Sequence, residues 1–125
     1  MKDFKSYYSI PAAPEEIYLA LTVATTIHLW SGEAAEMSNE AGSEFSLWEG
    51  AIVGKNLEFE ENKKIVQQWY FGESEPSIVT IKLHEDKSKT SVEVRHTNIP
   101  DEAYDDIAEG WNYNYFGALK EFFEE

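Results

Sequence analysis

Few residues of this chain have side chains suited to acid, base or metal chemistry. The sequence has no cysteine, and its three histidines, His28, His84 and His96, lie in separate segments without HExxH-type spacing. We therefore expect no metal, no cofactor and no nucleophile based on a thiolate. His96 is the one candidate for moving a proton, because it follows Val92 and Val94 at period two and shares their apolar strand face. The pattern fits either a ligand contact or a hydrogen-bonded histidine at a strand end.

Aromatic residues are more numerous, with four Trp, seven Tyr and seven Phe in 125 residues. Most large aromatic side chains in a domain of this size fill its core. Some could instead line an apolar pocket in which a few polar groups orient a ligand. Gln67 is a candidate for such a polar group, because its amide both donates and accepts. The candidate lining residues are Trp30, Phe45, Trp48, Gln67, Trp69, Phe71, His96, Trp111 and Tyr115.

The elements that must position these residues begin with a strand, because residues 4–10 alternate at period two. Pro14 and the two glutamates after it predict the start of a helix, and residues 25–31 predict a second short helix that Gly32 ends. The chain up to Pro100 then consists of short β-branched and aromatic segments separated by turn residues. The turns are short enough to predict hairpins, and hence an antiparallel meander. The expected strands are residues 44–48, 51–61, 63–71, 77–85 and 90–99.

Alternation within two of these strands sets the direction of their side chains. Gln67, Trp69 and Phe71 share one face of their strand. Glu58 alternates with Leu57 and Phe59, so we expect the glutamate to point away from the core and its two neighbours to point inward.

The C-terminal segment has a helical period, with Asp101 as the expected N-cap. A rotation of about 100° per residue aims Trp111 and Tyr115 at the sheet, with acids on the opposite side. A single antiparallel sheet needs such a cover, and a cleft remains wherever the curved sheet is not filled by the helix. The residues expected on the water-facing side are Asp106, Glu109, Gly110, Tyr113 and Gly117.

The chain resembles a known family through the order and spacing of six motifs. They are TTIHLWSG, GSEFSLWEGAIVGKNLEF, KKIVQQW, SIVTIKL, TSVEVRHTNIP and the terminal GW. The family is named for the C-terminal domain of the activator of the ninety-kilodalton heat-shock protein ATPase, within the START-like (SRPBCC, helix-grip) superfamily. The resemblance implies one START-like domain over residues 1–125. Family members often have arginine where Tyr70 follows Trp69 here, so a role that needs a cation at this position is not implied.

The implied fold is α+β. It has a curved antiparallel sheet of about six to seven strands, two short helices after the first strand, and a long C-terminal helix packed across the sheet. The resemblance implies a cavity between this helix and the sheet, and hence a domain that holds a small apolar or amphipathic molecule. One alternative is a chaperone-associated interaction domain of the ATPase-activator type. Another is a cyclase-like or hydrolase-like enzyme that uses His96, which we place last because the sequence offers no convergent set of catalytic groups.

The net charge of the chain limits the classes of partner that it can bind. The formal net charge is −14, from 10 basic and 24 acidic residues. Nucleic acid and anionic membranes are bound through an excess of Lys and Arg, so we expect neither as a partner. A basic protein surface is compatible with this charge. The absence of cysteine, of a secretory signal and of a membrane-spanning stretch predicts a cytoplasmic protein.

Overall fold

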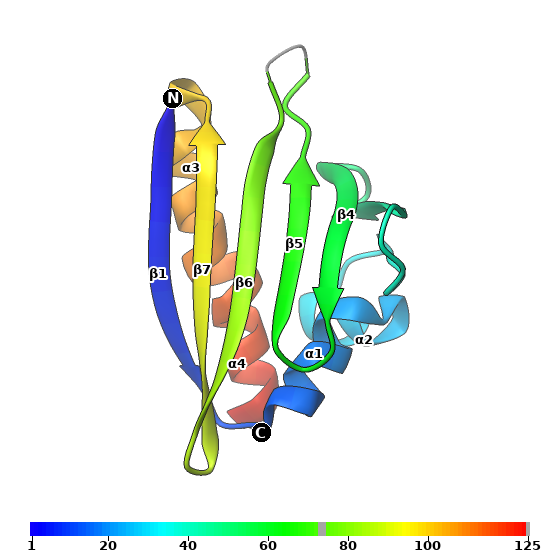
Figure 1. The fold of residues 1–125 in the computed structure, drawn as a ribbon, viewed down its shortest axis with the longest axis vertical. Coiled ribbons are helices and arrows are strands. Elements are labelled where there is room, and N and C mark those ends of the chain that lie inside the picture. The colour runs from blue at the N-terminus through cyan, green and yellow to red at the C-terminus, as the bar shows by residue number, and fades with distance from the viewer. Residues whose placement is uncertain (73–74, 125) are drawn as a thin grey trace.

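Residues 1–72 and 75–124, which are the part that the computed structural model describes, form a seven-stranded antiparallel sheet with helices on one face. Figure 1 shows this sheet in front of the helices. The strands are β1 (Lys2–Ile10), β2 (Ala35–Glu36), β3 (Glu44–Leu47), β4 (Ile52–Glu60), β5 (Lys64–Trp69), β6 (Ser77–Asp86) and β7 (Lys89–Ile99). The helical elements are α1 (Pro14–Thr22), α2 (Ala24–Ser31), η1 (Asp101–Ala103), α3 (Tyr104–Glu109), η2 (Gly110–Tyr115) and α4 (Phe116–Glu124).

The strand order confirms the predicted meander. From β2 to β7 each strand pairs with the next one along the chain, and β1 joins at the far edge beside β7. The pairing of β1 with β7 sets Tyr8 opposite Val92, so the first strand lies next to the last one. This architecture, with a long C-terminal helical segment over the sheet, is the predicted helix-grip fold.

The first short helix begins and the second ends where the sequence predicts. Pro14 occupies the first turn of α1, where its missing N–H costs nothing. Gly32 ends α2 in the left-handed conformation, with φ of 78°, which a residue without Cβ adopts freely. The indole Nε1 of Trp30 donates to the carbonyl of Ala20 at 2.8 Å and so joins α2 to α1.

The core lies between the inner face of the sheet and the helices. Alternate residues of β6 and β7 supply the sheet side, among them Val79, Val92 and Val94, which are fully buried. Phe116 and Leu119 supply the helix side and are also fully buried. Packing of these helix side chains against the valines removes apolar surface from water, and this burial is the main contribution to the stability of the fold.

A β-bulge corrects one expectation in β4. Asn56 pairs with Gln67, but the next paired residue of β4 is Glu58, so Leu57 is an extra residue in the ladder. Leu57 is consequently 39% exposed, and the prediction that it points inward is wrong. Glu58 is exposed as expected and forms an ion pair with Lys64 at 3.1 Å.

The terminal helical segment departs from the expected regular helix in two ways. Asp101 does not cap it, because this residue lies in the 3-10 turn η1 and its carboxylate pairs with the N-terminal ammonium at 3.0 Å. In addition, η2 is a π-helix, in which the hydrogen bonds skip one more residue than in an α-helix. Each residue of such a wide turn rotates less than 100° about the axis, so a regular helical wheel fails across it.

The π-helical segment allows two adjacent aromatic side chains to face the sheet. Tyr115 is 3% exposed and Phe116 is 0% exposed, while Tyr113 is 70% exposed as predicted. The start of α4 requires a glycine after them, because a Cβ on Gly117 would collide with the backbone oxygen of Asn112. The wide turn and Gly117 are therefore parts of one local structure.

Candidate ligand-binding cleft

A cleft of about 240 Å³ lies between the terminal helical segment and the β3–β4 turn. Its walls are mainly aromatic and aliphatic. A buried apolar cavity of about 150 Å³ is known to hold benzene, so this cleft has room for one ring-sized molecule. The lining residues are Trp48, Ala51, Ile52, Trp69, Asp106, Ile107, Gly110, Trp111, Asn114 and Tyr115.

The helix side of the cleft is formed around the π-helical segment η2. It contributes Gly110, Trp111, Asn114 and Tyr115. Asp106 is exposed as expected and borders the cleft at its open side, whereas Gly110, also expected on the water-facing side, is half-buried in the cleft wall. A Cβ on Gly110 would meet nothing within 4 Å, so the glycine leaves open space at this wall.

The opposite wall is the β3–β4 turn, whose backbone is strained. Trp48, Glu49 and Gly50 all have positive φ, at 53°, 55° and 91°. Positive φ is uncommon for a bulky residue such as tryptophan and costs of order 1–3 kcal/mol. The turn is closed by a hydrogen bond from the Ala51 amide to the Trp48 carbonyl at 3.1 Å. With this backbone the indole of Trp48 lies at the cleft, where its ring centroid is 5.6 Å from that of Tyr115.

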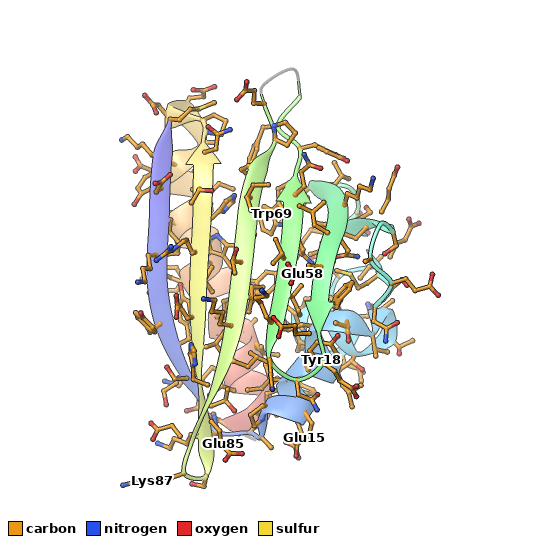
Figure 2. The ribbon with its side chains drawn as sticks, viewed as in Figure 1. Glu15, Tyr18, Glu58, Trp69, Glu85 and Lys87 are labelled. Atoms are coloured by element: carbon orange, nitrogen blue, oxygen red, sulfur yellow. The ribbon has the colours of Figure 1, made fainter. Side chains whose placement is uncertain are left out.

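The floor of the cleft is Trp69, the last residue of β5, which Figure 2 labels. Its indole stacks on that of Trp111 with ring centroids 5.0 Å apart and an interplanar angle of 26°. The strand partner of Trp69 is Gly54, and a Cβ there would collide with the carbonyl of Gln68 and the ring of Phe45. Gly54 thus lets the Phe45 ring lie against the sheet close to the floor.

A buried chain of hydrogen bonds fixes the Trp69 indole. Its Nε1 donates to Oε1 of Gln67 at 3.0 Å, and Nε2 of Gln67 donates to Oδ1 of Asn56 at 3.0 Å. Asn56 in turn donates to the hydroxyl of Ser43 at 3.1 Å. Among the described residues, every buried side-chain nitrogen and oxygen has a partner. Such a fully satisfied network stiffens its surroundings, because breaking any bond leaves a buried polar group unpaired.

His96 fixes the other indole. Nε1 of Trp111 donates to Nδ1 of His96 at 3.1 Å, so the neutral ring carries its proton on Nε2, which lies 2.7 Å from the Ser77 hydroxyl. Burial lowers the pKa of His96 to about 4, because the charged imidazolium loses its hydration there. His96 is uncharged at neutral pH and has both nitrogens engaged. This geometry gives it a positioning role behind Trp111 and offers no support for proton transfer to a molecule in the cleft.

The other residues that the sequence analysis proposed as lining lie behind the residues that line the cleft. Trp30 packs edge-on against Tyr115 at 5.2 Å and against Trp48 at 6.0 Å, so it supports both rings. Phe71 is half-buried, with its ring 6.3 Å from that of His96. Of the nine candidates, four line the cleft, namely Trp48, Trp69, Trp111 and Tyr115. The five that do not are Trp30, Phe45, Gln67, Phe71 and His96.

Sequence reasoning missed six lining residues, namely Ala51, Ile52, Asp106, Ile107, Gly110 and Asn114. The available signal was the pair of glycines, Gly110 and Gly117, inside an otherwise helical segment. Glycine costs about 1 kcal/mol relative to alanine in a helix interior, so two of them within eight positions indicate a local requirement.

Within residues 1–72 and 75–124, no group of three or more His, Asp or Glu side chains is arranged to hold a metal ion. No helix in the same ranges combines the length and the apolar character that a membrane crossing requires.

A curved antiparallel sheet around one long C-terminal helical segment, with a cleft beside that segment, defines a helix-grip domain. The chain belongs to the family described as Activator of Hsp90 ATPase homolog 1-like protein, whose sequence model matches residues 11–124.

Two curated relatives illustrate this membership. An activator of 90 kDa heat shock protein ATPase homolog from Dictyostelium discoideum is 29% identical over 126 residues, covering 98% of this chain and 33% of the relative. Activator of 90 kDa heat shock protein ATPase homolog 1 from Homo sapiens is 23% identical over 114 residues, covering 89% of this chain and 34% of the relative. The chain thus spans about a third of the length of these curated relatives.

A solved structure is similar to this chain over nearly the whole length of both. The crystal structure of an HSP90 activator from Plasmodium falciparum has a TM-score of 0.90 and 27% sequence identity. The match covers 98% of this chain and 96% of that one.

Proposed function

We propose that this chain is a binding domain that holds a small apolar or amphipathic molecule in the cleft between the terminal helical segment and the sheet. The observation that carries the proposal is the convergence of two irregular backbone segments on one cleft. The π-helical segment η2 forms one wall, and the left-handed turn at residues 48–50 forms the other. Both features are costly and are found preferentially at functional sites.

The aromatic walls are pre-organised. Trp69 is held by Gln67 and Trp111 by His96, and the two indoles stack on each other. A wall whose rotamers are already fixed loses little entropy when a molecule binds, which raises affinity for a given contact area.

The lining suits a molecule that is mostly apolar with a polar end. The amide of Asn114 and the carboxylate of Asp106 are its polar side-chain groups beside the Tyr115 hydroxyl. Asn114 and Asp106 are exposed, whereas Trp69, Trp111 and Tyr115 are buried. An amphipathic molecule would therefore place its ring or alkyl part against the indoles and its polar part toward the exposed end.

The test is a titration with benzyl alcohol, followed by amide and indole NMR shifts. We expect saturable shifts at the indole N–H of Trp69 and Trp111. Gly110→Leu should weaken binding at least about tenfold, because the new side chain enters the open space at the wall. Tyr113→Leu is the matched control, since Tyr113 lies in the same segment and is exposed. Shifts that fail to saturate, or that are unaffected by Gly110→Leu, would refute the proposal.

A second candidate function is stimulation of an Hsp90-type chaperone ATPase. The specific observation is the full-length match to the Plasmodium falciparum HSP90 activator, which has nearly the same extent as this chain. We propose to measure ATP hydrolysis by the ninety-kilodalton chaperone of the source organism with and without this protein. A rate that rises with protein concentration supports the activity. An unchanged rate together with no binding heat would exclude it. The predicted cytoplasmic location stays a prediction.

A further inference from the structure

We propose that the molecule held in the cleft is a small organic cation, a substituted ammonium of the choline type, with its charged head beside Asp106. This inference rests on the proposed binding function and adds the charge class of the ligand. It is carried by three features of the molecule: the distribution of charge along the chain, the composition of the cleft wall, and the surroundings of Asp106.

Charge is distributed unevenly between the segments. Residues 6–54 contain seven acidic residues and no Lys or Arg, and residues 101–125 contain eight acidic residues and one lysine. These two segments therefore carry the whole formal net charge of −14, while the remainder of the chain has nine basic and nine acidic residues.

The cleft lies between the two acidic segments. Nine of its ten lining residues come from them, and only Trp69 comes from the neutral remainder. A concave site bordered by charges of one sign attracts the opposite sign and raises its local concentration. An anionic molecule would be repelled from this cleft, whereas a cation would be attracted.

The wall itself has the composition of a cation site. Trp48, Trp69, Trp111 and Tyr115 line it, and no lysine or arginine does. Rings of this kind attract ammonium groups through their quadrupoles, and quaternary ammonium ligands are recognised by such aromatic walls. Asp106 supplies the one carboxylate of the lining.

Asp106 is available for a charged partner. Within residues 1–72 and 75–124, it forms no ion pair with any basic group. Three further exposed acids, Glu49, Asp105 and Glu109, directly follow or precede lining residues in the sequence. A cation at the exposed end of the cleft would thus be opposed by no positive side chain of the wall.

The test compares choline with 3,3-dimethylbutan-1-ol, which has the same shape without the charge. Both are titrated against the intact chain by isothermal calorimetry and by the indole N–H shifts of Trp69 and Trp111. We expect the dissociation constant of choline to be at least about fivefold lower than that of the alcohol. Raising the salt concentration from 0.05 to 0.5 M should reduce this difference, because Asp106 is exposed and its field is screened.

A pair of variants locates the charge. Asp106→Asn should weaken choline binding about threefold to tenfold and leave the alcohol unchanged. Asp105→Asn is the matched control, because it removes the same charge from the neighbouring exposed residue that does not line the cleft. Thermal unfolding of both variants verifies that they are folded.

The outcomes separate this inference from the binding function. Preferential choline binding that depends on Asp106 supports both. The preference for a cation is refuted if the two molecules bind equally, if the alcohol binds more tightly, or if the two Asp variants have equal effects. The cleft would then remain a binding site. Absence of saturable binding by either molecule and by benzyl alcohol overturns both.

Discussion

The two halves of the sheet are built differently, although one helical segment crosses both. In the half formed by β1, β6 and β7, the ladders run through long, nearly unbroken registers. In the half formed by β3, β4 and β5, the strands are mostly shorter, and the half holds a bulge at Leu57, the strained turn at residues 48–50 and the floor of the cleft. The helical segment packs closely on the half with regular alternation. Beside the irregular half, space remains between the helical segment and the sheet.

Side-chain size explains this difference. The inward positions of β6 and β7 are occupied by apolar side chains such as Val79, Ile81 and Val94, against which Phe116 and Leu119 pack. The inward positions of β4 include Gly54 and Asn56, one without a side chain and one that forms hydrogen bonds. Hydrogen bonds of a buried polar side chain therefore shape the inner face of β4, whereas the inner faces of β6 and β7 are mainly apolar.

The largest expected effect tests the role of burial in the regular half. Phe116→Ala should lower the free energy of unfolding by about 3–5 kcal/mol, because its ring is fully buried and stacks on Tyr8 at 4.9 Å. Ile107→Ala, at the cleft wall, should cost only about 1 kcal/mol, since that side chain is half-buried beside open space. Urea denaturation measures both. Similar losses for the two variants would erase the contrast between the halves.

The next effect concerns pH and His96, which lies on β7 in the regular half and whose ring packs against Trp69 of β5 in the other half. Its pKa falls from 6.5 to about 4 on folding, so between these values the unfolded chain binds a proton that the folded chain does not. The contribution of His96 to the free energy of unfolding is therefore present above pH 6.5 and is lost as the pH falls to about 4. The change is about 3 kcal/mol.

The measurement is the unfolding free energy between pH 4 and pH 7 for the unmodified chain and for His96→Gln. The variant should lose about 3 kcal/mol less than the parent over this range. His84→Gln is the control, because His84 is exposed on the other side of the sheet beside Glu93. Parallel pH profiles for the parent and His96→Gln would show that His96 is not held uncharged by burial.

A smaller loss is expected from Gly117→Ala. The added Cβ would collide with the Asn112 carbonyl, so the gain in helix propensity is outweighed and the net loss should be about 1–2 kcal/mol. Near-ultraviolet circular dichroism should also change, because relief of the collision rotates the adjacent Phe116 ring. If stability rose and the spectrum stayed constant, the π-helical register described above would be incorrect.

The smallest effect has the opposite sign and concerns the other glycine of the same segment. Gly110→Ala should raise the free energy of unfolding by about 0.5–1 kcal/mol, because Gly110 has helical φ and ψ and its Cβ would enter open space. Thermal and urea unfolding measure it. A destabilised variant would mean that the cleft wall is closed at this position.

Part of the cleft was predictable from periodicity. Alternation placed Trp69 and Gln67 inward, and the helical phase aimed Trp111 at the sheet, as the structure has them. Gly110 was expected to face water and instead lies half-buried at the cleft wall, because the prediction assumed an α-helical turn throughout. The turn width is decided by packing of Tyr115 and Phe116 against the sheet, a tertiary effect that a helical wheel does not contain.

Strand irregularity was unpredictable for a related reason. The letters around Leu57 alternate as in a regular strand, and nothing local marks the bulge. Around Trp48, Gly50 indicates a turn, but the left-handed backbone of Trp48 itself runs against its intrinsic preference. Such a conformation persists only because the surrounding rings of Trp30 and Tyr115 hold the indole in place.

The sequence by itself determined the order of strands and helices and the inward faces of β5, β7 and the terminal segment. These follow from local periods of 2 and about 3.6 residues, through which apolar side chains leave water. Only the tertiary structure decided which aromatic rings line the cleft and which support it from behind. That choice depends on one extra residue in a helical turn and one in β4, and neither is marked by a local period of the sequence.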